Sequence, residues 1–350
     1  MWRSFPNTIN PKLWIDNKSN LKVAFGLYNP YSLKGRLVKR LVSILPAFAG
    51  NLFLKPVNQT SLENEFNSYK RYIDNILSID SAINISPGTK SKHQKKSVQI
   101  INNKRIEYYL KISNNKETIE LSKNEYSILS LLSSKQLTTL TPKAVFGDFI
   151  ESSYYLIQSA APNEFYQSET AFLSEHNKCI IELYDLHHKE TDIQEYIASI
   201  KNYITRYNYN GKSNILATLD ALSEKNKKTK IQLSLTHGDF APWNILTNYD
   251  NELFIYDWEH GSENSPLLFD FFHFHFMTSK LLTNNTAAEI KSYIDNLYLE
   301  NKYKDIFTHM NISNAEYQLY SKLYLLEIIT REIRENDAPS TITASVFNIT

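Results

Sequence analysis

The sequence is short of several features, and each shortage narrows the class of protein. A single cysteine, Cys179, excludes an internal disulfide and is compatible with a reducing compartment. No secretory hydrophobic region follows Met1, and the apolar run that ends at Leu54 is broken by polar residues and too short to span a bilayer. There is no zinc-ligand spacing and no basic motif interleaved with aromatic residues, so we expect no nucleic-acid partner. A cytoplasmic protein is expected.

Glycine is also scarce, and the charge is balanced over the whole chain but not along it. The 350 residues include 8 glycines, against about 7% in an average protein, and Gly238 and Gly261 lie close to Asp239 and Asp257 in the sequence. Up to Lys111 there are 18 Lys and Arg against 6 Asp and Glu, and after it 20 against 31. This asymmetry is typical of solvated faces of opposite sign, or of an amino-terminal part that meets phosphates or an anionic surface.

The most informative segment is the one between His237 and Asp257. Strand-like stretches at 231–235, 245–246 and 253–256 predict a hairpin that brings Asn244 close to Asp257, with Asp239 at a strand edge. Transfer of a γ-phosphoryl group needs a carboxylate to orient or deprotonate the acceptor hydroxyl, and oxygen ligands to hold Mg²⁺. Asp239 suits the first role, and Asn244 with Asp257 suits the second. Each residue alone fits a turn, loop or cap equally well, and only the joint motif favours function.

Two stretches of this segment, HGDFAPWNIL and IYDWEHG, resemble the catalytic and metal loops of the aminoglycoside phosphotransferase and choline kinase superfamily. These enzymes are small-molecule relatives of protein kinases. The resemblance implies that Asp239 is the catalytic base, that Asn244 binds Mg²⁺ and that Asp257 is the main metal ligand. Asn244 also follows Asp239 by the five positions that separate the base and the metal-binding Asn of protein kinases.

The motif match is confined to residues 237–271. It includes a family-like Pro266 followed by Asp270, and the resemblance implies a structural role for Asp270. Downstream, His273 and His275 have no third ligand at a metal-like spacing, so we expect them to line the core or a pocket. The amino-terminal half matches the family only by the order of its elements.

That order assigns nucleotide binding to the amino-terminal half. A helix is predicted from Thr60, followed by strands at 98–101 and 106–112. In a kinase-like lobe the loop from Gly88 to Ser97, with one glycine and several lysines, would cover the ATP phosphates. Lys111 would contact the α- and β-phosphates, unless it is simply an exposed strand lysine.

Glu125, on the helix expected after Ser122, is the predicted partner of Lys111. Glu120 competes for this role. The Ser122 and Glu125 pair also fits a capping box that opens the helix, so the alternative to an ion pair is a purely local one.

The remaining elements complete a kinase-like order. Strands at 143–146 and 154–158 are expected to flank a turn at Gly147 and Asp148, and to lead into a hinge at 159–162. There, the backbone of Ser159 and Ala161 would meet adenine. Amphipathic helices are predicted at 172–186, 193–203, 215–222 and 317–328, and residues 338–350 look like a tail.

These elements predict an α+β, two-lobed protein kinase-like fold with a small antiparallel-sheet N-lobe and a mostly helical C-lobe. We divide the chain into an N-terminal extension (1–59), a nucleotide-binding N-lobe (60–159), and a helical C-lobe with the catalytic loop and acceptor site (160–350). Residues 33–48 of the extension form a basic amphipathic helix with Lys34, Arg36, Lys39 and Arg40. It is expected to pack on the kinase body, or to contact the inner face of the membrane peripherally.

The expected function is phosphorylation of a small-molecule hydroxyl, with ATP and Mg²⁺. Aminoglycoside, choline or ethanolamine, and sugar acceptors all remain open. No Ala-Pro-Glu ending follows Asp257, which argues against protein substrates. Two alternatives stay in place: a nucleotide-binding pseudokinase without turnover, and a membrane-associated adaptor that uses residues 34–48. Retention of Asp239, Asn244 and Asp257 argues against the pseudokinase.

Overall fold

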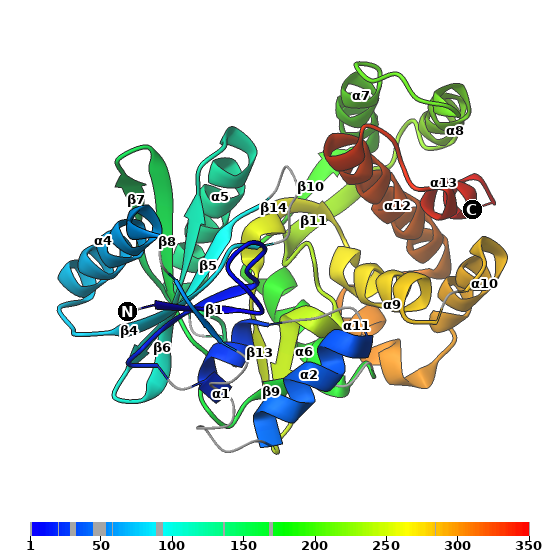
Figure 1. The fold of residues 1–350 in the computed structure, drawn as a ribbon. Coiled ribbons are helices and arrows are strands. Elements are labelled where there is room, and N and C mark those ends of the chain that lie inside the picture. The colour runs from blue at the N-terminus through cyan, green and yellow to red at the C-terminus, as the bar shows by residue number, and fades with distance from the viewer. Residues whose placement is uncertain are drawn as a thin grey trace. The chain divides into compact units, whose positions relative to one another are not determined.

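The chain forms two compact units (Figure 1). Unit 1 comprises Met1–Lys135 and Thr141–Pro162, and unit 2 comprises Gln136–Leu140 and Asn163–Thr350. The computed structural model describes residues 2–19, 21–28, 33–44, 54–57, 59–88, 94–135, 137–167, 171–283 and 285–349. Within these ranges, no helix is long and apolar enough to cross a membrane.

Unit 1 is built on one eight-stranded antiparallel sheet with the order β3-β1-β2-β4-β5-β6-β8-β7. The strands are β1 (Trp2–Phe5), β2 (Leu13–Asp16), β3 (Lys55–Pro56), β4 (Ala82–Ser86), β5 (Lys96–Asn102), β6 (Arg105–Ser113), β7 (Ala144–Ile150) and β8 (Ser153–Ser159). The first three come from residues 1–59, which we predicted as an extension. The described part of that segment is therefore continuous with the sheet that carries Lys111.

The helices of unit 1 are α1 (Leu21–Ala24), the 3₁₀ turn η1 (Phe25–Leu27), α2 (Leu33–Ile44), α4 (Thr60–Leu77) and α5 (Lys116–Ser133). Two apolar clusters bury residues of α1, η1, α2 and α4. Phe66, Tyr69 and Ile73 recur at helical spacing on α4 and are buried against strand residues such as Val98 and Ile100. Residues of β1, β2, α1, η1 and α2, together with Leu54 just before β3, form the second cluster: Phe5, Leu13, Ile15, Leu21, Ala24, Phe25, Val42 and Leu54.

The start of α5 differs from the predicted capping box. The helix begins at Lys116 because the side chain of Asn115 accepts a hydrogen bond from the Thr118 N–H at 2.9 Å. Ser122 is thus buried within the helix, where its Oγ lies 2.8 Å from Ser113 Oγ on β6. The predicted cap was wrong because Asn115 supplies an earlier one.

The turn expected at Gly147 and Asp148 was also wrong. Both residues lie within β7, and the chain reverses after Ile150, where Glu151 has a φ of 55°. A Cβ on Gly147 would approach the Tyr126 ring to 2.3 Å. The glycine is therefore needed for the close packing of α5 on the strand, and not for a turn.

Unit 2 contains two small sheets and most of the helices. The sheet orders are β10-β11-β14 and β13-β12-β9. The strands are β9 (Tyr166–Gln167), β10 (His188–Asp192), β11 (Lys230–Thr236), β12 (Ile245–Thr247), β13 (Leu253–Ile255) and β14 (Ser262–Pro266). The helices are α6 (Ser174–Leu186), α7 (Ile193–Ile204), α8 (Lys212–Lys225), α9 (Phe269–Leu281), α10 (Ala287–Leu297), α11 (Lys304–His309), α12 (Asn314–Asn336) and α13 (Thr341–Ile349), with 3₁₀ turns η3 (Pro242–Asn244), η4 (Trp258–His260) and η5 (Asn301–Tyr303).

The carboxyl-terminal residues form a helix where we predicted a tail. Val346 and Phe347 of α13 are only 2% and 1% exposed, and α13 packs against α10 and α12. In the same unit, α9 is buried on nearly every side, because every residue from Phe269 to Phe276 is buried and five of these eight are phenylalanine.

Candidate active site

The loop after β11 is fixed by a carboxylate from the first turn of α9. Asp270 accepts hydrogen bonds from the backbone N–H groups of His237 at 2.6 Å and Gly238 at 2.9 Å. Burial raises the pKa of Asp270 to about 7, although both N–H donors favour its charged form. The structure thus gives Asp270 a backbone-anchoring contact, in line with the structural role implied by the resemblance.

The same loop is tied to the chain that follows β13. His237 Nδ1 accepts from the Asp239 N–H at 3.2 Å, so the proton is on Nε2, which donates to the Tyr256 carbonyl at 2.9 Å. Gly238 has a φ of 80°, and a Cβ there would lie 2.0 Å from the His260 carbonyl oxygen. Only glycine fits this position.

Asp239 is held at both carboxylate oxygens. Oδ1 lies 2.8 Å from His273 Nε2, and Oδ2 accepts from Asn244 Nδ2, also at 2.8 Å. The side chain keeps 26% of its exposure. Burial alone would raise the pKa of Asp239, but the hydrogen bond from His273 and the charge of Arg331 outweigh it and hold that pKa well below its usual range. A charged, partly exposed carboxylate can orient a hydroxyl group in contact with it and can accept the hydroxyl proton as the oxygen reacts.

Asn244 and Asp257 meet across the predicted hairpin. β12 pairs with β13 through Ile245 and Ile255, and the Tyr256 N–H donates to the Asn244 carbonyl at 3.1 Å. Asp257 follows directly, with a φ of 69° in the left-handed region, which is uncommon outside glycine. The hairpin prediction was correct.

The donors in this part of unit 2 suit a hard cation. Asn244 Nδ2 donates to the carbonyl and carboxylate of Asp239, so its amide oxygen Oδ1 is the atom left for a ligand. Asp257 and Glu259 place carboxylate oxygens within 4.8 Å of each other. Oxygen donors of this kind fit Mg²⁺. We did not predict Glu259, although its place two residues after Asp257 was visible in the sequence.

We did not predict the contacts that two further residues make with this loop. His273 is 2% exposed and contacts Asp239, whereas we expected only a core or pocket-lining role. Arg331 of α12 donates from Nη1 to the Gly238 carbonyl at 2.7 Å. These contacts join residues 34 and 93 positions apart, a separation at which no local sequence pattern signals contact.

In unit 1, the structure pairs the predicted phosphate lysine with its predicted partner. Lys111 Nζ on β6 lies 2.8 and 2.7 Å from the two carboxylate oxygens of Glu125 on α5. Glu125 is fully buried, whereas the competing Glu120 is exposed. Such a cation stabilises a buried carboxylate, because an unpaired charge in the interior is costly. Contact of Lys111 with phosphate remains a prediction.

The other residues predicted to bind nucleotide are placed as follows. Gly88 follows β4 with a φ of 75°, and a Cβ there would lie 2.2 Å from the Lys95 carbonyl. Residues 89–93 of the lysine-rich loop lie outside the described residues. The N–H groups of Ser159 and Ala160 donate to the carbonyls of Lys143 and Glu107, both at 2.9 Å, so Ala161 is left as the hinge donor for adenine. These assignments also remain predictions.

Comparison with known proteins identifies the fold. No family model and no curated protein matches the sequence. Among solved structures, a thermostable mutant of aminoglycoside phosphotransferase APH(4)-Ia, in a ternary complex with ADP and hygromycin B, is similar with a TM-score of 0.50 and 12% identity, over 80% of this chain and 95% of that one. The chain therefore shares the fold of this phosphotransferase, and the predicted two-lobed protein kinase-like fold class is confirmed.

A second similar structure is choline kinase LicA from Streptococcus pneumoniae. Its TM-score is 0.49 at 14% identity, over 82% of this chain and 97% of that one. The similarity to the aminoglycoside phosphotransferase covers 80% of this chain, well beyond residues 237–271, the range to which the motif match was confined.

The buried imidazole of His237 should make stability depend on pH. Burial lowers the pKa of His237 to about 4 from 6.5. Its contribution to stability is fully present above pH 6.5 and is lost as the pH falls towards 4, because unfolding then takes up a proton. Between pH 7 and 5 this loss amounts to about 2 kcal/mol. His237→Gln keeps a donor for Tyr256, and should shrink the loss by that amount in denaturant titrations at both pH values.

The matched control is His188→Gln, which removes an exposed histidine. It should leave the difference between pH 7 and pH 5 as in the wild type. An unchanged difference in His237→Gln as well would show that His237 is not held neutral in the folded state.

Proposed function

We propose that this protein transfers the γ-phosphoryl group of ATP to a hydroxyl of a small molecule, with Mg²⁺ as cofactor. The observation that carries the proposal is the two-sided support of the Asp239 carboxylate by His273 and Asn244. A carboxylate held in one orientation, charged and partly open to solvent, has the properties of a general base. The kinase-like fold supports the same reaction class.

Asp239 acts on the acceptor in this proposal. Its carboxylate accepts the proton of the acceptor hydroxyl as the hydroxyl oxygen bonds to the γ-phosphorus and the bond from phosphorus to the β,γ-bridging oxygen breaks. ADP leaves with the electrons of that bond, and the proton on Asp239 passes to solvent. Because the group is already fixed by two donors, little reorganisation accompanies the step.

Asn244 and Asp257 would hold Mg²⁺, through an amide oxygen and a carboxylate, with Glu259 as a further oxygen donor. The ion would offset the charge of the β- and γ-phosphates. In unit 1, Lys111 would bind the α- and β-phosphates while Glu125 holds its ammonium group in place. We accordingly assign nucleotide binding to residues 60–159 and the acceptor to residues 160–350.

The acceptor class is open among aminoglycosides, choline or ethanolamine, and sugars. The similar structure with hygromycin B supports including aminoglycosides in the first panel. A pseudokinase that binds nucleotide without turnover is the alternative function. The intact contacts around Asp239 favour turnover, because a chain that only binds nucleotide has no need to orient a base.

The proposed roles predict different losses for the two aspartates. Asp257→Ala should abolish both metal-dependent nucleotide binding and turnover, since the phosphates lose the cation that offsets their charge. Asp239→Asn keeps the shape but not the basicity. It should leave Mg·ATP affinity nearly unchanged and slow transfer by about 10²- to 10⁴-fold. Calorimetry of Mg·ATP binding and an ATP-turnover assay with an established acceptor measure these effects.

The matched control is Asp250→Asn, which changes an exposed aspartate in the turn of the same hairpin. It should behave as wild type in both assays. Wild-type turnover by Asp239→Asn would refute the catalytic assignment. A wild type that bound Mg·ATP but phosphorylated no member of a broad acceptor panel would establish the pseudokinase.

For α2 we propose a peripheral contact with anionic membrane. Its Val42 is buried in unit 1, but Leu37, Leu41 and Ile44 on another face are 61%, 54% and 71% exposed. Lys39 and Arg40 lie on the same helix and suit anionic headgroups. The side chains of Lys34 and Arg36, and residues 45–48 of the predicted helix, lie outside the described residues.

This proposal predicts binding to vesicles that contain phosphatidylserine. Replacement of Leu37, Leu41 and Ile44 by glutamine should weaken sedimentation with these vesicles at least about tenfold, because apolar burial in the interface is lost. Leu299→Gln, which removes an exposed leucine of unit 2, is the control. Equal partitioning of the triple variant and the wild type, both folded, would leave α2 without a membrane role.

A further inference from the structure

His273 lies outside the predicted motif, but it contacts the proposed catalytic base, Asp239. Its imidazole is buried on α9, and Nε2 lies 2.8 Å from Asp239 Oδ1. We propose that His273 is the positioning residue for the base, and that it fixes the Asp239 carboxylate for proton transfer and for support of Asn244. The inference rests on the proposed function for its catalytic part only.

The hydrogen bonds around the imidazole show which ring nitrogen carries the proton. Tyr324 Oη lies 3.4 Å from His273 Nδ1, and a tyrosine hydroxyl donates to a neutral imidazole nitrogen. With Nδ1 as the acceptor, Nε2 carries the hydrogen and donates it to Asp239. Tyr324 therefore donates to His273, and His273 donates to Asp239.

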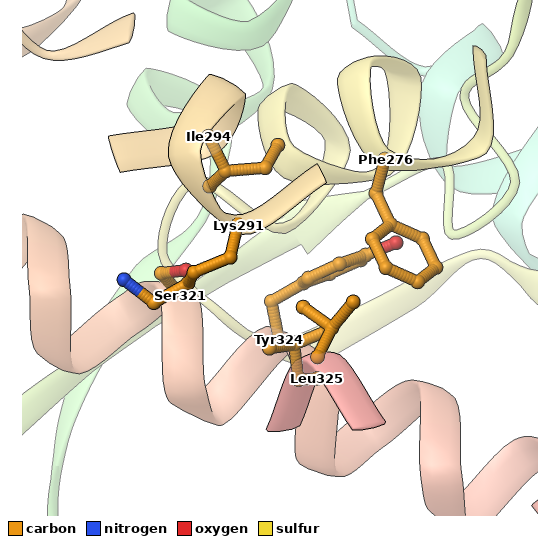
Figure 2. Close-up of a pocket in the computed structure, with 7 residues that line it drawn as sticks. Phe276, Lys291, Ile294, Ser321, Tyr324 and Leu325 are labelled. Atoms are coloured by element: carbon orange, nitrogen blue, oxygen red, sulfur yellow. The ribbon is translucent and has the colours of Figure 1, made fainter. Parts of the chain in front are cut away.

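The imidazole has little room to rotate. It stacks on the Phe269 ring at an interplanar angle of 12° and a centroid distance of 5.6 Å. The Arg331 guanidinium lies over the same Phe269 ring, 5.6 Å from its centroid. Tyr324 is packed just as tightly. Beside it, Phe276, Leu325 and their neighbours enclose a cavity of only about 10 Å³, close to the space of one water molecule (Figure 2).

Loss of the His273 donor would free one end of the carboxylate. Asp239 Oδ2 would keep its bond from Asn244, but rotation of the carboxylate would no longer be opposed at Oδ1. The amide of Asn244 donates to both the carbonyl and the carboxylate of Asp239. Without His273, the carboxylate that accepts one of these two hydrogen bonds would no longer be fixed. One histidine thus orients the base directly and the proposed metal-binding amide indirectly.

The chain offers a matched pair of histidines for the test. His275, two residues further along α9, is buried to a similar extent and also contacts a tyrosine, with Nδ1 2.8 Å from Tyr293 Oη. Its partners are distinct from those of Asp239. His275→Leu therefore controls for the loss of a buried imidazole from the same helix.

The kinetic test compares His273→Leu, His273→Gln and His275→Leu. His273→Leu should lower kcat about 10- to 100-fold with the KM values for ATP and acceptor within about twofold of wild type. His273→Gln, whose amide nitrogen can replace Nε2 as donor, should recover much of the loss. Equal losses in His273→Leu and His275→Leu, or no recovery with glutamine in a folded variant, would overturn the inference.

A second measurement needs no turnover. The side-chain amide of Asn244, followed by ¹⁵N NMR, should exchange its protons with solvent at least about tenfold faster in His273→Leu, and at the wild-type rate in His275→Leu. An unchanged Asn244 amide in His273→Leu would overturn the positioning role. If the wild type transfers no phosphate, the proposed function fails, and this measurement still decides whether His273 positions Asp239.

Discussion

The site in unit 2 depends on the burial of the Asp270 carboxylate beneath the loop that carries Asp239. A buried carboxylate is costly unless donors satisfy it, and here the donors are the backbone N–H groups of His237 and Gly238. The loop conformation and the carboxylate therefore stabilise each other. Gly238 completes the arrangement, because any side chain at its positive φ would collide with the His260 carbonyl.

The same helix that fixes the backbone of the loop also fixes its reactive side chain. Asp270 and His273 are three positions apart on α9, a spacing that places both on one helix face. Asp270 holds the main chain of the loop, and His273 holds the Asp239 carboxylate. Because α9 is buried by aromatic neighbours, both contacts are transmitted by a rigid element and not by a mobile loop.

The sequence was sufficient to predict features that depend on residues close together in the chain. The hairpin of β12 and β13 follows from strand-forming residues on either side of a polar turn, so the approach of Asn244 to Asp257 could be predicted. The fold class followed from the order of elements and the motif. Lys111 and Glu125 are on consecutive elements, which kept the choice of partner to two acidic residues.

What the sequence did not reveal depends on tertiary contacts. His273 resembles its neighbour His275 in pattern, and only packing shows that one faces Asp239 and the other Tyr293. Arg331 reaches Gly238 from a helix near the carboxyl terminus. α13 was taken for a tail because its burial of Val346 and Phe347 depends on α10 and α12, and Gly147 was taken for a turn because Tyr126 is distant in sequence.

Diffraction tests most directly whether the donors around Asp239 form the proposed metal-assisted phosphoryl-transfer site. Crystals grown with Mn²⁺ and a non-hydrolysable ATP analogue report the ion through its anomalous signal. We expect a manganese peak within about 2.2 Å of the Asn244 amide oxygen and an Asp257 carboxylate oxygen. A bound nucleotide whose manganese ion is held by other residues of the chain would contradict it.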